Sequence, residues 1–306
     1  MTTLIATSVI RGSRQGDSHG GVYLIDLEGQ RARQTIDWNT TDIDWQGRGW
    51  DRGLRGIAFD DKRVFVAASD ELFVYTPDFE LIASYRSPYL RHCHEICQYE
   101  RRLFLTSTGF DSILGFDLDE NRFSMGLHLA NRNERLTAML FDPNDKRGPA
   151  AGNEYHLNSV YCDKRGMFIS GLRTEALLVF GGRQVERVTA VPRGAHNARP
   201  FRDGIVFNDS EADVVRFVAP DSQRVFKIPR YADEQLTHTD MDDSRIARQA
   251  FGRGLCAISD HVIATGSSPS TITLHDLESM KTTTSINLTM DVRNAIHGLE
   301  VWPYSV

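Results

Sequence analysis

Short apolar runs separated by polar turns recur along the whole chain, and they are rich in β-branched and aromatic residues. Residues 54–59, 64–67 and 72–75 form one such series, and residues 93–97 and 103–106 begin the next. Runs of this length and composition, bounded by turn-forming residues, predict β-strands. Further series begin at residues 155, 195, 253 and 296. The chain is therefore expected to be all-β and to repeat one small sheet six times.

The last series reaches the end of the chain after its first strand, at residues 296–302. Residues 3–8 and 22–26, at the other end, have the composition of the missing strands. β-Propellers join their first and last blades by pairing a C-terminal strand with N-terminal strands. We therefore predict a six-bladed β-propeller that occupies residues 1–306 as a single domain.

A histidine or an arginine stands at the same position of every series. In a propeller the first strand of each blade lines the central channel, so side chains at one repeated position converge on its axis. The six aligned residues are Arg55, His94, His156, His196, Arg253 and His297. This repetition predicts a functional site on the axis.

The aligned histidines are candidate metal ligands, because a divalent ion would satisfy one acceptor nitrogen of each crowded imidazole. Histidine-rich coordination suits transition metals better than calcium or magnesium. We favour Fe(II), with Zn or Cu as the other candidates. An alternative is a hydrogen-bonded polar channel, or an anion site made by the two arginines and protonated histidines. The expected metal ligands are His94, His156, His196 and His297.

The two aligned arginines are the main candidates for substrate binding. Arg55 and Arg253 are expected to hold a carboxylate, phosphate or sulfate group through charge-assisted hydrogen bonds. Asn158 and Asn197 follow aligned histidines closely and are further candidates, although asparagine is also common in turns.

Two glutamates follow aligned histidines and are the expected catalytic carboxylates, Glu95 and Glu300. Neighbouring residues of a strand point to opposite faces, so we expect Glu95 to face an adjacent blade. There it is expected to accept a ring N–H from a histidine.

Four long segments each precede an aligned residue, so we expect them as loops over one mouth of the channel. Residues 36–52 place Trp45 and Trp50 among carboxylates and arginines, a mixture that suits a sugar or aromatic ligand or anchors the loop. Residues 241–250 match a short helix that Gly252 would end. The four segments are residues 29–52, 120–153, 219–251 and 279–294.

Composition narrows the class of partner. The net charge is −6 and no long basic stretch occurs, which argues against nucleic acid as a partner. No apolar run approaches the roughly 20 residues of a membrane span, and the first residues do not resemble a signal peptide. We therefore expect a cytoplasmic protein that binds a small anionic molecule; its oligomeric state is left open.

The remaining histidines and the cysteines are expected to be structural. The histidines outside the aligned position fall in turns, inserts or outer strands, so we expect them to be solvated; they are His19, His92, His128, His238, His261 and His275. The cysteines lack the spacing of a disulfide-stapled module, so we expect buried thiols at Cys93, Cys97, Cys162 and Cys256.

Residues 196–204 and 290–303 resemble an uncharacterised bacterial propeller family. More broadly, the chain is similar to the six-bladed propellers that include gluconolactonases, strictosidine-synthase-like proteins and NHL-repeat proteins. Gluconolactonases bind a divalent cation through Glu, Asn and Asp, where this chain has His and Arg, so the resemblance does not imply lactone hydrolysis. The four axial histidines resemble instead the Fe(II) site of carotenoid cleavage oxygenases, by analogy of the site alone.

Three classes of function are compatible with these residues. The favoured one is a metal-dependent enzyme, with oxygenase-type chemistry for Fe(II) or hydrolysis or elimination for Zn. The second is a non-catalytic module that binds an acidic sugar or peptide. The third is a scaffold for protein partners, which is disfavoured because six ionisable groups near one axis are costly to bury.

Overall fold

The computed structural model describes residues 2–14, 16–39, 53–132, 135–240 and 248–305. In these ranges the chain forms six antiparallel sheets, five with four strands and one with five, and a short 3-10 helix at Asp233–Gln235. Strands within each blade follow one another in sequence order, as in a propeller. The prediction of an all-β, six-bladed propeller is confirmed. No helix in the same ranges is long and apolar enough to span a bilayer.

Two compact units make up the chain. Unit 1 comprises Met1–Arg55 and Arg202–Val306, and unit 2 comprises Gly56–Phe201.

Unit 1 contains the blade that joins the two ends of the chain. Its other strands form a second complete blade and the outer three strands of a third. The first blade has β1 (Thr3–Ile10), β2 (Gly21–Asp26), β3 (Arg31–Asp37) and β25 (Asn294–Val301); the second has β21 (Arg253–Ala257), β22 (Val262–Ser267), β23 (Thr271–Asp276) and β24 (Lys281–Asn287); the third includes β18 (Gly204–Asp209), β19 (Val214–Ala219) and β20 (Ser222–Lys227).

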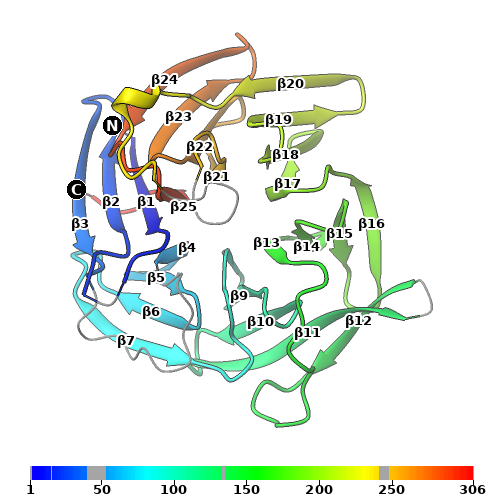
Figure 1. The fold of residues 1–306 in the computed structure, drawn as a ribbon. Helices are drawn as coiled ribbons and strands as arrows, with labels where there is room; N and C mark the ends of the chain where they lie inside the picture. Colours follow the sequence, from blue (N-terminus) through cyan, green and yellow to red (C-terminus); the bar gives the residue numbers. More distant parts are fainter. Residues whose placement is uncertain (1, 15, 40–52, 133–134, 241–247, 306) are drawn as a thin grey trace. The chain divides into compact units, whose positions relative to one another are not determined.

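The C-terminal strand closes the first of these blades. β25 lies beside β1 in antiparallel pairing, with Leu4 opposite Val301 (Figure 1). The hydroxyl of Thr7 accepts a hydrogen bond from the Gly298 N–H at 2.8 Å and donates one to the Arg55 carbonyl. The closure predicted from the repeat is therefore confirmed.

We expect Thr7→Val to lower the free energy of unfolding by about 2 kcal/mol, because it leaves buried backbone groups of Gly298 and Arg55 without their hydroxyl partner. Thr283→Val, at an exposed position of β24, is the matched control and is expected to stay within about 0.5 kcal/mol of the wild type. Urea unfolding measures both, and equal stability of the two variants would contradict this role for Thr7.

Unit 2 contains three further blades and the first strand of another. The first has β4 (Leu54–Asp60, beginning just before the unit boundary), β5 (Arg63–Ala68), β6 (Glu71–Tyr75) and β7 (Leu81–Arg86); the second has β8 (Ile96–Tyr99), β9 (Arg102–Ser107), β10 (Ser112–Asp117), β11 (Arg122–Arg132) and β12 (Arg135–Phe141); the third has β13 (Leu157–Asp163), β14 (Gly166–Gly171), β15 (Ala176–Phe180) and β16 (Val185–Ala190). The additional strand is β17 (Ala195–Phe201).

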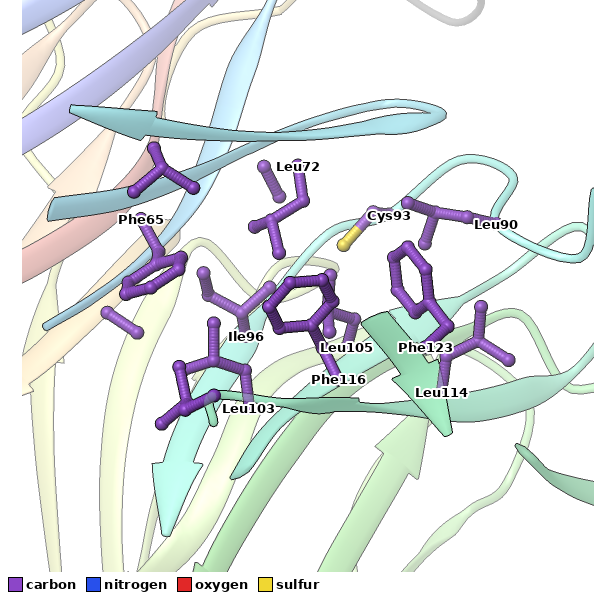
Figure 2. Packing of buried hydrophobic residues seen from close by; sticks show 14 of the residues in the cluster. Phe65, Leu72, Leu90, Cys93, Ile96, Leu103, Leu105, Leu114, Phe116 and Phe123 are labelled. Atoms are coloured by element: carbon purple, nitrogen blue, oxygen red, sulfur yellow. The ribbon is translucent and has the colours of Figure 1, made fainter. Parts of the chain in front are cut away.

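Aromatic side chains fill the space between the first two blades of unit 2. Phe116 of β10 lies among aliphatic side chains, with Phe65 and Phe123 on either side (Figure 2). Its ring centroid is 4.8 Å from that of Tyr85 and 5.2 Å from that of Phe123. Such packing buries a large apolar area between the two adjacent sheets.

The four segments expected as loops contain strands as well. β3, β20 and β24 are the outermost strands of their blades, and β11 with β12 gives one blade a fifth strand. Outer strands such as β3 and β16 are mostly exposed, so their sequences carry little apolar signal. The helix predicted for residues 241–250 falls largely on residues 241–247, outside the described residues.

Candidate functional site

Three of the aligned histidines lie in unit 2, each at the start of an innermost strand. His94 precedes β8, and His156 precedes β13 with a left-handed backbone (φ 54°). His196 is the second residue of β17 and is 3% exposed. The three recurring histidines therefore lie near the beginning of an innermost strand, within about three residues of one equivalent position.

Backbone carbonyls orient two of these imidazoles in the same way. The His94 Nδ1 lies 2.8 Å from the His92 carbonyl and 2.9 Å from the Thr108 hydroxyl, and the His196 Nδ1 lies 3.0 Å from the Gly194 carbonyl. Because a carbonyl oxygen only accepts, Nδ1 must carry the proton. In the neutral imidazole Nε2 is then the nitrogen with the lone pair, the form that binds metals.

His94 and His156 come from adjacent blades and are in contact. Their ring centroids are 5.3 Å apart, with the rings inclined at 60°. The Thr108 hydroxyl, next to the His94 ring, donates to the carbonyl of Leu157 at the start of β13. The Thr108 hydroxyl thus connects the His94 ring to the backbone of the residue that follows His156.

A buried carboxylate, Asp111, holds the turn that carries His156. Its Oδ2 accepts hydrogen bonds from the backbone N–H of Glu154 and, at 3.0 Å, from that of Tyr155. Burial raises the pKa of Asp111, although these backbone donors act in the opposite direction. Sequence reasoning missed Asp111 and Thr108; their only signal is their place in the turn between β9 and β10.

Glu95 lies just before β8, and its carboxylate has hydrogen-bond partners in β13 and β17, the innermost strands of the next two blades. Its Oε1 accepts a hydrogen bond from Asn197 Nδ2 at 3.2 Å. The residue as a whole is partly exposed, yet Oε2 is buried and has no hydrogen-bond partner among the described residues. Burial raises the pKa of Glu95, while the Arg199 charge and hydrogen bonds from Ser159 and Asn197 lower it. Glu95 was expected to accept a ring N–H from a histidine. For His94 and His196, backbone carbonyls accept the Nδ1–H instead.

The two candidate asparagines link strands. Asn158 is 2% exposed, and its Nδ2 donates to the Ala195 carbonyl at 3.1 Å. Asn197 has a left-handed backbone (φ 55°) and holds Glu95. Both side chains therefore support the innermost strands, and a substrate-binding role for them stays a prediction.

The other aligned residues lie in unit 1. Arg253 Nη1 is 3.4 Å from both ring nitrogens of His297, and its guanidinium lies over the Phe251 ring at 4.6 Å from the centroid. Arg55 is 1% exposed, and Glu300 of β25 is half-buried opposite Ile5. Since His297 belongs to unit 1, an ion shared by all four histidines stays a prediction, as do the roles of Arg55, Arg253 and Glu300.

Two expectations about the site receive no support within the described residues. There, no group of three or more His, Cys, Asp and Glu side chains is placed to hold one metal ion. Trp45 and Trp50, expected to bind substrate, lie outside the described residues. Of the predicted metal ligands, His94 and His156 are two whose rings the structure brings into contact.

Two histidines expected to be solvated are in fact buried. His19 and His275 are both 0% exposed. The Nε2 of His275 lies 3.0 Å from the hydroxyls of both Thr265 and Thr273, and its Nδ1 lies 3.0 Å from that of Thr282. The expectation was wrong for His275 because hydroxyl groups of its own strand and of both neighbouring strands satisfy the ring, and the partners Thr265 and Thr282 cannot be identified from the local sequence.

Comparison with known proteins supports the fold. No protein-family model matches the chain, and no curated protein sequence matches it. A solved structure described as a nidogen/laminin complex is similar, with a TM-score of 0.61, 10% identity and coverage of 98% of both chains. A protein of unknown function from Bacteroides caccae has a TM-score of 0.58 at 10% identity, with 99% of both chains covered. At these identities the likeness shows the β-propeller fold and no particular activity.

Proposed function

We propose that the protein is a metal-dependent enzyme that acts on a small anionic organic molecule, with His94 and His156 as core metal ligands. The observation that carries this proposal is the orientation of His94. Its Nδ1 is held by the His92 carbonyl and Thr108, so Nε2 carries the lone pair that can coordinate an ion, and the His156 ring lies in contact. Ligating histidines are commonly oriented by a hydrogen bond to the other ring nitrogen.

Two imidazoles from adjacent blades leave several coordination positions of an ion for water, substrate or further ligands. Open positions are a property of catalytic metal sites, whereas structural sites are closed. Nitrogen ligands suit Fe(II), Zn or Cu, and we favour Fe(II), as the resemblance of the histidine set to carotenoid cleavage oxygenases suggests. His196, whose Nδ1 is held in the same manner, is the proposed third ligand if the innermost strands adjust on binding.

The alternative of a non-catalytic module for acidic ligands is favoured by Arg253. This guanidinium is buried beside His297 and over an aromatic ring, a setting that strengthens charge-assisted hydrogen bonds to a carboxylate. The two functions differ in one respect: a binding module keeps its ligand affinity when His94 is replaced, whereas the enzyme loses its metal.

Metal analysis tests the proposal. Protein purified without a histidine tag and reconstituted anaerobically with Fe(II), or separately with Zn, is expected to retain about one equivalent of metal, and His94→Ala or His156→Ala to weaken binding at least tenfold, by about 1.4 kcal/mol or more. The matched control is His128→Ala. His128 of β11 has the same anchoring, with Nδ1 2.9 Å from the Phe110 carbonyl, but lies away from the innermost strands. The proposal fails if the wild type retains less than about 0.2 equivalents, or if all three variants bind alike.

A further inference from the structure

Two cysteines from adjacent blades of unit 2 lie against each other. Cys97 is in β8 and Cys162 is in β13, strands that lie side by side. The backbone N–H of Cys162 donates to the Cys97 sulfur at 3.3 Å. Both residues belong to one apolar cluster between these blades, where Cys162 is 8% exposed and Cys97 is half-buried. Neither the fold nor the proposed metal site requires thiols at these two positions.

The contacts distinguish the two thiols chemically. A hydrogen bond to the Cys97 sulfur, with burial, raises the pKa of the Cys162 thiol. Cys162 therefore keeps its proton, while the Cys97 sulfur receives the Cys162 backbone N–H. The Cys97 thiol in turn lies 3.6 Å from the Gln98 carbonyl, to which it donates. The thiolate is the nucleophile in thiol oxidation, so Cys97 reacts after it loses this proton. Cys97 is also the more exposed of the pair, which allows a small oxidant to reach it.

We propose that Cys97 and Cys162 are a redox-modification site, at which a peroxide joins the innermost strands of two blades by a disulfide. The Cys97 thiolate attacks one peroxide oxygen, forms a sulfenic acid and releases hydroxide, which takes up a proton. The Cys162 sulfur then displaces the sulfenic oxygen, and its proton leaves with that oxygen as water. In sum, two thiols and one hydrogen peroxide give one disulfide and two waters.

The disulfide would change the positions of the strands that follow His94 and His156. His94 precedes β8 by two residues and His156 immediately precedes β13, so the disulfide joins the two strands that follow these histidines. A disulfide requires its sulfurs about 2 Å apart, closer than two thiols in contact, so the strands must adjust. The expected consequence is a change in metal affinity of about tenfold. This consequence rests on the proposed function, whereas disulfide formation does not.

Peroxide treatment of the folded, full-length protein tests the site. After mild oxidation with hydrogen peroxide, thiol alkylation is expected to fall from four cysteines to two, and peptide mapping without reductant to find Cys97 joined to Cys162. Cys97→Ser and Cys162→Ser should each abolish the cross-linked peptide, while Cys93→Ser and Cys256→Ser should retain it. Four reactive thiols after oxidation, or a cross-link between other cysteines, would overturn the proposal.

A second readout separates this inference from the proposed function. Metal affinity is compared between the reduced and the cross-linked wild type, with Fe(II) or Zn as the probe. Equal affinity in the two states would refute the link to the histidines. A protein that binds no metal in either state would refute the proposed function, and the cross-linked peptide alone would then decide the redox site.

Discussion

Gly20→Ala is expected to lower the free energy of unfolding by about 4 kcal/mol, because a side chain at this position meets the backbone of β1. Gly20 has a φ of +110°, and a Cβ there would lie 2.1 Å from the Ser8 carbonyl oxygen and 2.5 Å from the Ser8 carbonyl carbon. Neither atom can move without breaking the pairing of β1. The same turn contributes the Gly20 carbonyl to a 2.9 Å hydrogen bond from Trp38 N–H, so a shift would spread to the end of β3.

Urea unfolding with Gly16→Ala as the matched control separates the two causes. Gly16 also has a left-handed backbone (φ +91°), but a Cβ at that residue would meet no atom within 4 Å. It therefore reports the conformational cost alone, about 1 to 2 kcal/mol. If Gly20→Ala costs no more than Gly16→Ala, the close approach of Ser8 does not limit this turn.

The second large effect is a loss of stability in acid that depends on His275. Burial lowers the pKa of His275 to about 4, from 6.5 in an exposed histidine. The folded state therefore binds fewer protons than the unfolded chain between these two values, and its stability falls as the pH decreases from about 6.5 to 4. The lowered pKa corresponds to about 3 kcal/mol over that range.

Unfolding free energies at pH 7 and pH 4.5 measure this effect. His275→Gln is expected to be less stable than the wild type at pH 7, because it loses the stacking on Phe226 and part of the threonine hydrogen bonding. Its further loss on acidification from pH 7 to pH 4.5 should be smaller than that of the wild type by about 2.4 kcal/mol, since glutamine does not titrate. His261→Gln, at an exposed turn, is the control and should respond to acid like the wild type. Identical pH dependence in all three proteins would contradict the assignment to His275.

The repeat and its closure could be predicted from the sequence because strand signals are local. An innermost or central strand such as β5 is buried along nearly its whole length, so its residues are apolar and recognisable one blade after another. The outer strands could not be predicted in the same way. β16 is exposed at five of its six positions, and β11 and β12 lengthen one blade without any change in composition that marks an added strand.

The candidate site was likewise predicted in part from the sequence. The sequence placed His94, His156 and His196 at one repeated position, and the structure puts each at the start of an innermost strand. The sequence did not predict which ring nitrogen of His94 and His196 forms hydrogen bonds. The partners are backbone carbonyls and the hydroxyl of Thr108, and their positions depend on the path of the backbone. Nor did the sequence predict that Asp111 would hold the His156 turn from 43 and 44 residues away.

By itself, the sequence determined the all-β class, the six repeats and the pairing of the chain ends, because these follow from apolar periodicity within short windows. Only the tertiary structure decided that His275 is buried among threonines and that Cys97 lies against Cys162. The physical reason is that burial and hydrogen bonding depend on neighbours from other strands: the Cys162 N–H and the Cys97 sulfur are 65 residues apart in the chain and 3.3 Å apart in space.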